Sequence, residues 1–370
     1  MGVAIRDDAG VTEYGSDREP ESPEQRTARI LRTQADHCEA VGSSLYAGLL
    51  RHTADDLLVG GPAAGVLDGH YADPGRSALA LRMLGGIHAL VLTGQAPELA
   101  AFYPSAGGTA DAGPGARCAW PALREVLDVH RDEIRDWLPR PPQTNEVGRG
   151  AALAGALCYL VAEAEYPVRL VEIGASAGLN LRADHFWISG AGVSFGPESS
   201  PVRMPGAWRG QSPPAGPVDV AARTGGDLAP VDPVSDDGRL LLCAYVWADQ
   251  VDRLERLRGA CELAAKIPAD LRQEPALATI AGLRPEPGTW TVLWHSIMRQ
   301  YLDREEVREL SDGVAAIGAA ATESARFAHV TLELAKGTLD APVELTTWPG
   351  GVHRRLGTAP PHGVPVTWTA

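Results

Sequence analysis

The stretch that decides the fold reads Val168-Arg-Leu-Val-Glu-Ile-Gly-Ala-Ser-Ala-Gly-Leu-Asn180. Its first six residues are mostly apolar, which predicts a buried strand over 168–173. Gly174, Ser176 and Gly178 follow at alternate positions and predict a tight turn before a helix. This order of strand, turn and helix is typical of the first unit of a mainly parallel α/β sheet.

Further strands are expected along the C-terminal part of the chain, where apolar runs at first alternate with helical stretches. The runs predict strands at 240–247, 290–294, 329–334, 343–348 and 364–368. The last of these follow one another without helices, so we expect them to form an antiparallel edge hairpin. The segment 190–233 is rich in Gly, Pro and Ser, and is expected to be partly irregular.

The chain ahead of the expected sheet has a different character. Residues 1–26 are acidic and lack apolar periodicity, which predicts a disordered tail. Apolar residues then recur at helical spacing. The predicted fold class is therefore α/β, with an all-helical domain over 27–140 and a Rossmann-like, mainly parallel sheet over 141–370.

Composition excludes several classes of partner. Asp and Glu outnumber Lys and Arg by 47 to 33, and the resulting net charge of −14 would repel a nucleic-acid backbone. The longest apolar run, 151–162, is shorter than the roughly 18 residues that a membrane-spanning helix needs. The scattered cysteines and histidines form no metal-ligand pattern. We expect a cytoplasmic protein that acts on a small-molecule substrate, without nucleic acid, membrane or metal.

The glycine-rich turn resembles the first motif of class I S-adenosylmethionine-dependent methyltransferases. The segment Glu172–Asn180 has the acidic residue and the alternating small residues of that motif, and Ser176 stands in place of its middle glycine. Gly225-Gly-Asp227 resembles the turn after the third strand of those enzymes, whose acidic residue often contacts adenine. The resemblance implies an S-adenosylmethionine cofactor held by Glu172, Gly174, Ser176, Gly178, Asn180 and Asp227.

The same resemblance implies catalytic groups at the ends of the fourth and fifth strands. Asp249 follows the strand expected at 240–247, and His295 follows the strand expected at 290–294. Either side chain would accept a proton from the methyl acceptor. Each also has a structural explanation, because Asp249 would cap the next helix and His295 would be a buried imidazole bonded to a backbone carbonyl.

A polar segment, Gln143-Thr-Asn-Glu-Val-Gly-Arg149, stands where the helical part meets the expected sheet. In one interpretation Asn145, Glu146 and Arg149 bind and orient a small polar substrate. In the other, Thr144 or Asn145 caps the start of a helix and Glu146 lies in its first turn. The sequence leaves both interpretations open.

A narrower resemblance runs along the whole chain. It is similar to an uncharacterised bacterial family, a domain of unknown function with a methyltransferase-like second half. The segments that carry the similarity are Leu84–Leu90, Gln143–Arg149, Glu172–Asn180, Tyr245–Gln250 and Trp294–Ser296. This resemblance implies a fold and no particular reaction.

The expected function is methyl transfer from S-adenosylmethionine to a small polar metabolite, and two alternatives stay open. The segment 174–178 also fits the G-x-S-x-G pattern of α/β-hydrolases, which would make Ser176 a nucleophile served by Asp227 or Asp249 and a later histidine. A non-catalytic nucleotide-binding or partner protein is the other alternative. The sequence does not determine the oligomeric state.

Overall fold

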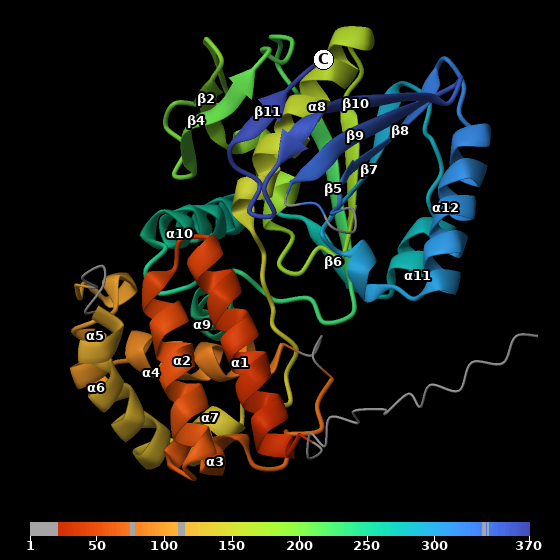
Figure 1. Ribbon diagram of the computed structural model, residues 1–370. Coiled ribbons are helices and arrows are strands. Elements are labelled where there is room, and N and C mark those ends of the chain that lie inside the picture. Colours follow the sequence, from red (N-terminus) through yellow and green to blue (C-terminus); the bar gives the residue numbers. More distant parts are fainter. Residues whose placement is uncertain (1–20, 75–77, 110–114, 335–337, 339) are drawn as a thin grey trace, which may run out of the picture.

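The computed structural model describes residues 21–74, 78–109, 115–334, 338 and 340–370. Figure 1 shows a helical body beside a large sheet with helices on both of its faces. The predicted fold class is confirmed, since N-terminal helices precede a C-terminal, mainly parallel sheet that also contains antiparallel strands.

The helical body is built mainly from the N-terminal part of the chain. Its elements are α1 (Pro23–Ala40), α2 (Ser44–Leu58), α3 (Pro62–Leu67), α4 (Leu79–Leu92), α5 (Pro97–Ala100), η2 (Pro104–Ala106), α6 (Gly115–Val129) and α7 (Arg131–Arg135). A later helix, α9 (Asp236–Ala244), packs against α4. Trp247 and Ala248, which follow α9, are buried in the same apolar core. The helical body therefore includes residues from beyond the boundary predicted near 140.

Helix α1 begins within the stretch that was expected to be a tail. Ser22 Oγ accepts a hydrogen bond from the backbone N–H of Gln25 at 3.2 Å, and Gln25 Oε1 accepts one from the N–H of Ser22 at 2.8 Å. This reciprocal pair is a capping box, and it starts the helix at Pro23. The rest of the expected tail, residues 1–20, lies outside the described residues.

The sheet has a parallel centre and antiparallel additions. Its strands are β1 (Val168–Ile173), β2 (Trp187–Gly190), β3 (Val193–Phe195), β4 (Arg203–Gly210), β5 (Val220–Asp227), β6 (Asp270–Gln273), β7 (Thr289–Ser296), β8 (Ala325–Leu332), β9 (Ala341–Trp348), β10 (Val352–Ala359) and β11 (Val366–Trp368). Their spatial order is β3-β2-β4-β11-β10-β9-β8-β7-β1-β5-β6. Strands β6, β5, β1, β7 and β8 are mutually parallel. The chain moves to one side of β1 and then, with β7, to the other, so a topological switch point lies between β1 and β7.

The antiparallel part begins with β9, which pairs with β8, and continues with β10. The expected antiparallel strands are thus present, but they lie inside the sheet and not at its edge, because the edge strands are β3 and β6. Strand β11 then pairs antiparallel with β10 and parallel with β4. In this way β11 joins the outer strands β2–β4 to the rest of the sheet (Figure 1).

Helices cover the two faces of the sheet with separate apolar cores. One face packs against α8 (Gly150–Glu163), η4 (Leu179–His185) and α10 (Val251–Lys266). The other packs against α11 (Ala276–Ala281) and α12 (Arg304–Ala319). Side chains alternate between the faces along β1, where Leu170 joins the first core and Val171 and Ile173 join the second.

The prediction of a strand at 240–247 is wrong, because this stretch belongs largely to helix α9. Ser235 caps the helix by accepting the N–H of Gly238 at 3.0 Å, and two aspartates follow in the first turn. A short apolar run within a helix cannot be distinguished from a strand by periodicity alone. The other predicted strands correspond to β7, β8, β9 and β11.

Replacing Gly155 with alanine should lower the free energy of unfolding by about 2 kcal/mol. Alanine favours a helix by about 1 kcal/mol over glycine. A Cβ atom at this position in α8, however, would overlap the indole ring of Trp368, which is only 1% exposed and is held by β11. Overpacking therefore outweighs helix propensity, and urea unfolding measures the difference.

Gly282→Ala is the matched control, because a Cβ atom there meets nothing within 4 Å. It should change the free energy of unfolding by less than about 0.5 kcal/mol. Equal stabilities of Gly155→Ala and Gly282→Ala would contradict the packing described for Trp368.

Candidate functional site

A cleft of about 790 Å³ lies outside the carboxyl ends of β5 and β6. Its walls come from the segment after α7, from the loops after β5 and β6, and from the first half of α9. We call it the carboxyl-edge cleft, and its lining residues are Trp137, Arg140, Pro141, Gln143, Ala229, Pro230, Val231, Asp232, Ser235, Asp237, Gly238, Leu240, Leu241 and Gln273. Doubly wound sheets bind their ligands beyond this edge of the sheet.

The glycine-rich turn after β1 is joined to the wall of this cleft by Ser176. Its hydroxyl donates to Gln143 Oε1 at 3.1 Å, and its carbonyl accepts the N–H of Val231 at 3.2 Å. Gly174, Ser176 and Gly178 all have positive φ, at 68°, 52° and 62°. A positive φ costs a non-glycine residue about 1–2 kcal/mol of conformational free energy. The hydrogen bonds of Ser176 therefore hold it in a conformation that glycine would adopt without strain.

Asp227 fixes the same turn from the neighbouring strand. It is the last residue of β5, which pairs directly with β1. Its Oδ2 atom accepts the N–H of Ser176 at 2.8 Å, and its Oδ1 atom accepts the N–H of Ala229 at 2.9 Å. The position expected from the resemblance, after a third strand, is therefore corrected to the end of the strand next to β1. Each carboxylate oxygen keeps a lone pair for a ligand.

Glu172, in β1, and Asn180, in η4, are buried and do not line the cleft. Burial raises the pKa of Glu172 to about 8, although Trp294, Arg149 and Arg182 act in the opposite direction. Asn180 Nδ2 donates to the carbonyl of Glu146 at 3.2 Å. Within the described part of the chain, Glu172 Oε2 and Asn180 Oδ1 have no hydrogen-bond partner.

The three predicted substrate-binding residues are engaged by the chain itself. Asn145 Oδ1 accepts the N–H of Leu179 at 2.8 Å. Arg149 donates from Nε to the carbonyl of Pro361 at 2.9 Å and from Nη1 to that of Ser296 at 3.3 Å. These bonds tie the segment 143–149 to the turn, to β7 and to the loop before β11.

Glu146 joins three segments of the chain at one buried carboxylate. It caps η3 (Val147–Arg149) by accepting the N–H of Gly148 at 3.1 Å. Its Oε2 atom lies 2.7 Å from Arg253 Nε, 2.6 Å from Arg253 Nη2, and 3.3 Å from His362 Nδ1. Burial alone would raise the pKa of Glu146, but Arg253, His362 and Arg149 outweigh burial and hold that pKa well below its usual range. The helix-capping interpretation thus holds for Glu146 itself, and not for Thr144 or Asn145.

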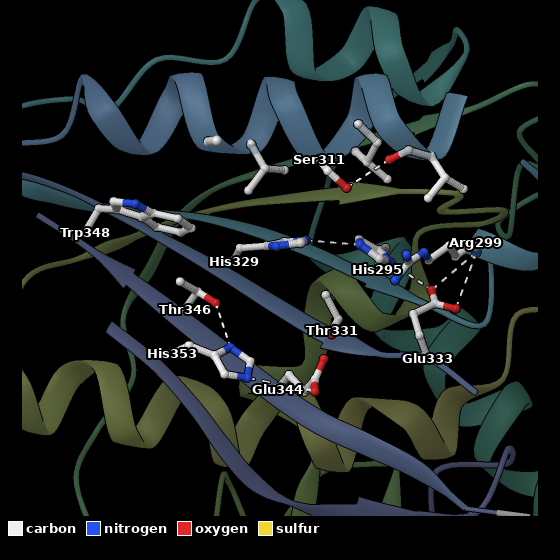
Figure 2. Close-up of a pocket in the computed structure, with 14 residues that line it drawn as sticks. His295, Arg299, Ser311, His329, Thr331, Glu333, Glu344, Thr346, Trp348 and His353 are labelled. Atoms are coloured by element: carbon white, nitrogen blue, oxygen red, sulfur yellow. Dashed lines mark hydrogen bonds and ion pairs between the residues drawn. The ribbon is translucent and has the colours of Figure 1, made fainter. Parts of the chain in front are cut away.

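The two predicted proton acceptors, His295 and Asp249, lie apart from the cleft. Asp249 follows α9, where it accepts the hydroxyl of Ser43 at 2.6 Å and the N–H of Leu45 at 3.2 Å. It therefore caps the start of α2 instead of ending a strand. His295 is the last residue but one of β7, on the face that α12 covers, and its Nδ1 atom lies 2.8 Å from Glu333 Oε1 (Figure 2).

The hydrolase alternative requires a histidine at the hydroxyl of Ser176. Among the described residues, the hydrogen-bond partner of that hydroxyl is Gln143, and no imidazole is bonded to it. The partners of His295 are Glu333 and His329. The geometry therefore does not assemble the triad that the G-x-S-x-G pattern would need.

Sequence reasoning missed several residues that complete these clusters. Arg253 and His362 meet Glu146 from distant parts of the chain, and Glu333 and His329 meet His295. Glu333 directly follows β8, so an acidic residue at a predicted strand end was the available signal. No comparable pattern marked Arg253, which lies on an ordinary amphipathic helix.

The architecture is that of an α/β protein in which a helical N-terminal body packs beside a mainly parallel sheet. The chain belongs to the bacterial family described as "Uncharacterized protein conserved in bacteria (DUF2332)", which matches residues 28–368. Comparison with curated proteins and with solved structures gave no match.

Among the described helices, none combines the length and the apolar character needed to cross a membrane. Within the same residues, no group of three or more His, Cys, Asp or Glu side chains is placed to hold a metal ion.

Proposed function

We propose that the chain binds S-adenosylmethionine in the carboxyl-edge cleft and transfers its methyl group to a small polar acceptor. The observation that carries this proposal is the link between turn and cleft. Ser176, in the turn after β1, is hydrogen-bonded to two residues that line the cleft, Gln143 and Val231. A small-residue turn beside a cleft at this edge of a parallel sheet is the arrangement that binds nucleotide-like ligands.

The lining of the cleft fits the parts of this cofactor. Leu240, Leu241 and Val231 offer an apolar surface for a purine ring, and Gln143 and Gln273 offer amide groups at its edge. Asp227 does not itself line the cleft, but it bonds to the N–H of Ala229, which does, and it has lone pairs left for the ribose hydroxyls. A volume of about 790 Å³ lies within the ordinary range of ligand pockets.

The cofactor supplies an electrophilic methyl group, and the residues of the chain bind and orient the reactants. Asp232 and Asp237 line the cleft, where their carboxylates would hold a cationic or hydroxylated acceptor. Glu172 and Asn180 are buried and do not line the cleft. Catalysis in such a site depends mainly on the alignment of the acceptor with the methyl group.

The test is calorimetric titration of the protein with S-adenosylmethionine and S-adenosylhomocysteine. Ala229 is exposed and lines the cleft, so Ala229→Trp should fill the cleft and weaken binding at least tenfold. The matched control is Ala316→Trp, on the exposed side of α12, which should bind as the wild type does. No binding to the wild type, or equal binding to both variants, would refute the proposal.

A second measurement separates an enzyme from a non-catalytic nucleotide-binding protein. The protein is incubated with S-adenosylmethionine and pooled polar metabolites, and S-adenosylhomocysteine is quantified. We expect an acceptor-dependent release that Ala229→Trp abolishes and Ala316→Trp retains. Binding without release from any acceptor would favour a sensor or partner protein over a methyltransferase.

A further inference from the structure

A second cavity, of about 270 Å³, lies between α12 and the face formed by β7, β8 and β9. We call it the α12 cavity. Figure 2 shows Trp348 near one end, Glu333 and Arg299 near the other, and the two rings of His329 and His295 between them. Apolar side chains of α12, among them Val314, form its roof. The cavity thus has an aromatic end, a charged end and a polar floor.

The floor of the α12 cavity contains a chain of three ionisable groups. Glu333 Oε1 lies 2.8 Å from His295 Nδ1, and His295 Nε2 lies 3.0 Å from His329 Nε2. A carboxylate only accepts hydrogen bonds, so His295 Nδ1 carries a hydrogen and donates it to Glu333. With both rings neutral, the hydrogen between the two Nε2 atoms is then on His329, and His329 Nδ1 carries none.

The far end of this chain is fixed by backbone groups. Glu333 also accepts the N–H groups of Met298 at 3.1 Å and Arg299 at 3.4 Å. These bonds hold the carboxylate in place, and the carboxylate in turn orients the ring of His295, which is 2% exposed. Glu333 and His295 are therefore positioning residues, and the next ring is the one that meets a ligand.

His329 is the free end of the chain. It lines the cavity, and within the described residues its Nδ1 atom has no hydrogen-bond partner. Burial, together with the nearby His295 and Arg299, holds the pKa of His329 well below its usual range. The ring is accordingly neutral at physiological pH and has a lone pair to offer.

Two further features of the cavity restrict the chemical class of the ligand. The guanidinium group of Arg299 lines the charged end and, in the described part of the chain, forms no hydrogen bond or ion pair, so it is available to a carboxylate. Trp348 lines the aromatic end, where its ring stacks on Phe327 with centroids 5.2 Å apart. The remaining ionisable groups at the cavity are Glu344 and His353, and His353 Nε2 lies 3.9 Å from Glu344 Oε1.

We propose that the α12 cavity binds a small aromatic hydroxy acid and that His329 takes up the proton of its hydroxyl group. The aromatic ring would pack against Trp348, and the carboxylate would pair with Arg299. The ligand O–H bond breaks as an N–H bond forms at His329 Nδ1. The hydrogen on His329 Nε2 moves to His295 Nε2, which leaves a ligand oxyanion and a His295 imidazolium paired with the carboxylate of Glu333. This site does not depend on the carboxyl-edge cleft.

The probe for this proposal is 3-hydroxybenzoate, in which the hydroxyl group is meta to the carboxylate. Calorimetric titration compares it with benzoate, which lacks the hydroxyl, and with 3-hydroxybenzamide, which lacks the charge. We expect 3-hydroxybenzoate to bind at least tenfold more tightly than either analogue, equivalent to about 1.4 kcal/mol. Absence of binding to the wild type at millimolar concentration would overturn the proposal.

Two adjacent alanines of α12 supply a matched pair of variants. Ala315 lines the cavity and Ala316 does not. Ala315→Trp should abolish binding of 3-hydroxybenzoate, and Ala316→Trp should leave its affinity within about twofold of the wild type. Equal affinities would place the ligand elsewhere and overturn the assignment. Titration of both variants with S-adenosylmethionine keeps this result distinct from that for the cleft.

The ratio of the affinities for 3-hydroxybenzoate and benzoate tests the proton acceptor itself. His329→Gln should bring this ratio from at least ten to about one, because the variant retains the cavity without the base. Glu333→Gln should also reduce the ratio, because the His295 imidazolium would lose its counter-charge. A folding defect lowers both affinities together and leaves the ratio unchanged. A wild-type ratio in His329→Gln would overturn the role of this residue.

Discussion

Replacing Glu146 with alanine should lower the free energy of unfolding by about 3–5 kcal/mol at neutral pH. The buried carboxylate accepts from Gly148, pairs with Arg253 and lies beside His362. Its removal leaves the largely buried Arg253 guanidinium, whose side chain is 13% exposed, without its counter-charge. A buried ion that has lost its partner is costly, and urea unfolding measures that cost.

The double variant Glu146→Gln with Arg253→Met provides the control. It removes both charges at once, so it should lose clearly less stability than the sum of the two single variants. Because the pKa of Glu146 is depressed in the folded state, its contribution should be present above about pH 4.5 and be lost as the pH falls further. Additive losses in the double variant would show that the pair contributes nothing as a pair.

Replacing Glu172 with glutamine should remove a pH dependence of stability that the wild type has between about pH 5 and pH 8. The pKa of Glu172 is about 8 in the folded protein and near 4.5 in the unfolded chain. Between these values the folded protein holds a proton that the unfolded chain releases, so stability falls as pH rises. The slope approaches about 1.4 kcal/mol per pH unit.

Urea unfolding at pH 5, 6.5 and 8 compares the wild type with the variant. The two proteins should be close in stability at pH 5, and Glu172→Gln should be the more stable at pH 8. Glu165→Gln changes an exposed glutamate shortly before β1 and should keep the slope of the wild type. A wild-type slope in Glu172→Gln would mean that Glu172 is ionised in the folded protein at neutral pH.

The parts of the fold that the sequence predicted are those in which local pattern and tertiary structure agree. The apolar run over 168–173 is β1, and the turn that follows has the positive φ values that small residues permit. Strand β5 had no such signal, because Val220–Asp227 contains few apolar residues and two glycines. It forms a strand because it pairs with β1 and β6, which periodicity within the segment cannot reveal.

The candidate site was predictable to a similar degree. The glycine turn, Asp227 and the segment from Gln143 were chosen from local motifs, and the structure brings them together through hydrogen bonds at Ser176. The sequence predicts Asp249 at the end of a strand over 240–247. This prediction is wrong, because that stretch belongs largely to helix α9. Arg253 and His362 reach Glu146 only through the tertiary fold, and no spacing along the chain encodes such a meeting.

Strand β11 determines when this protein can complete its fold during synthesis. It is the last strand in chain order, yet it lies inside the sheet, between β10 and β4. A nascent chain that has emerged only as far as β10 therefore holds two unjoined sheets, and each exposes a strand edge that invites pairing with other chains. Residues 366–368 must leave the ribosome before these edges meet, so the sheet closes later than the strands on either side of the junction are made.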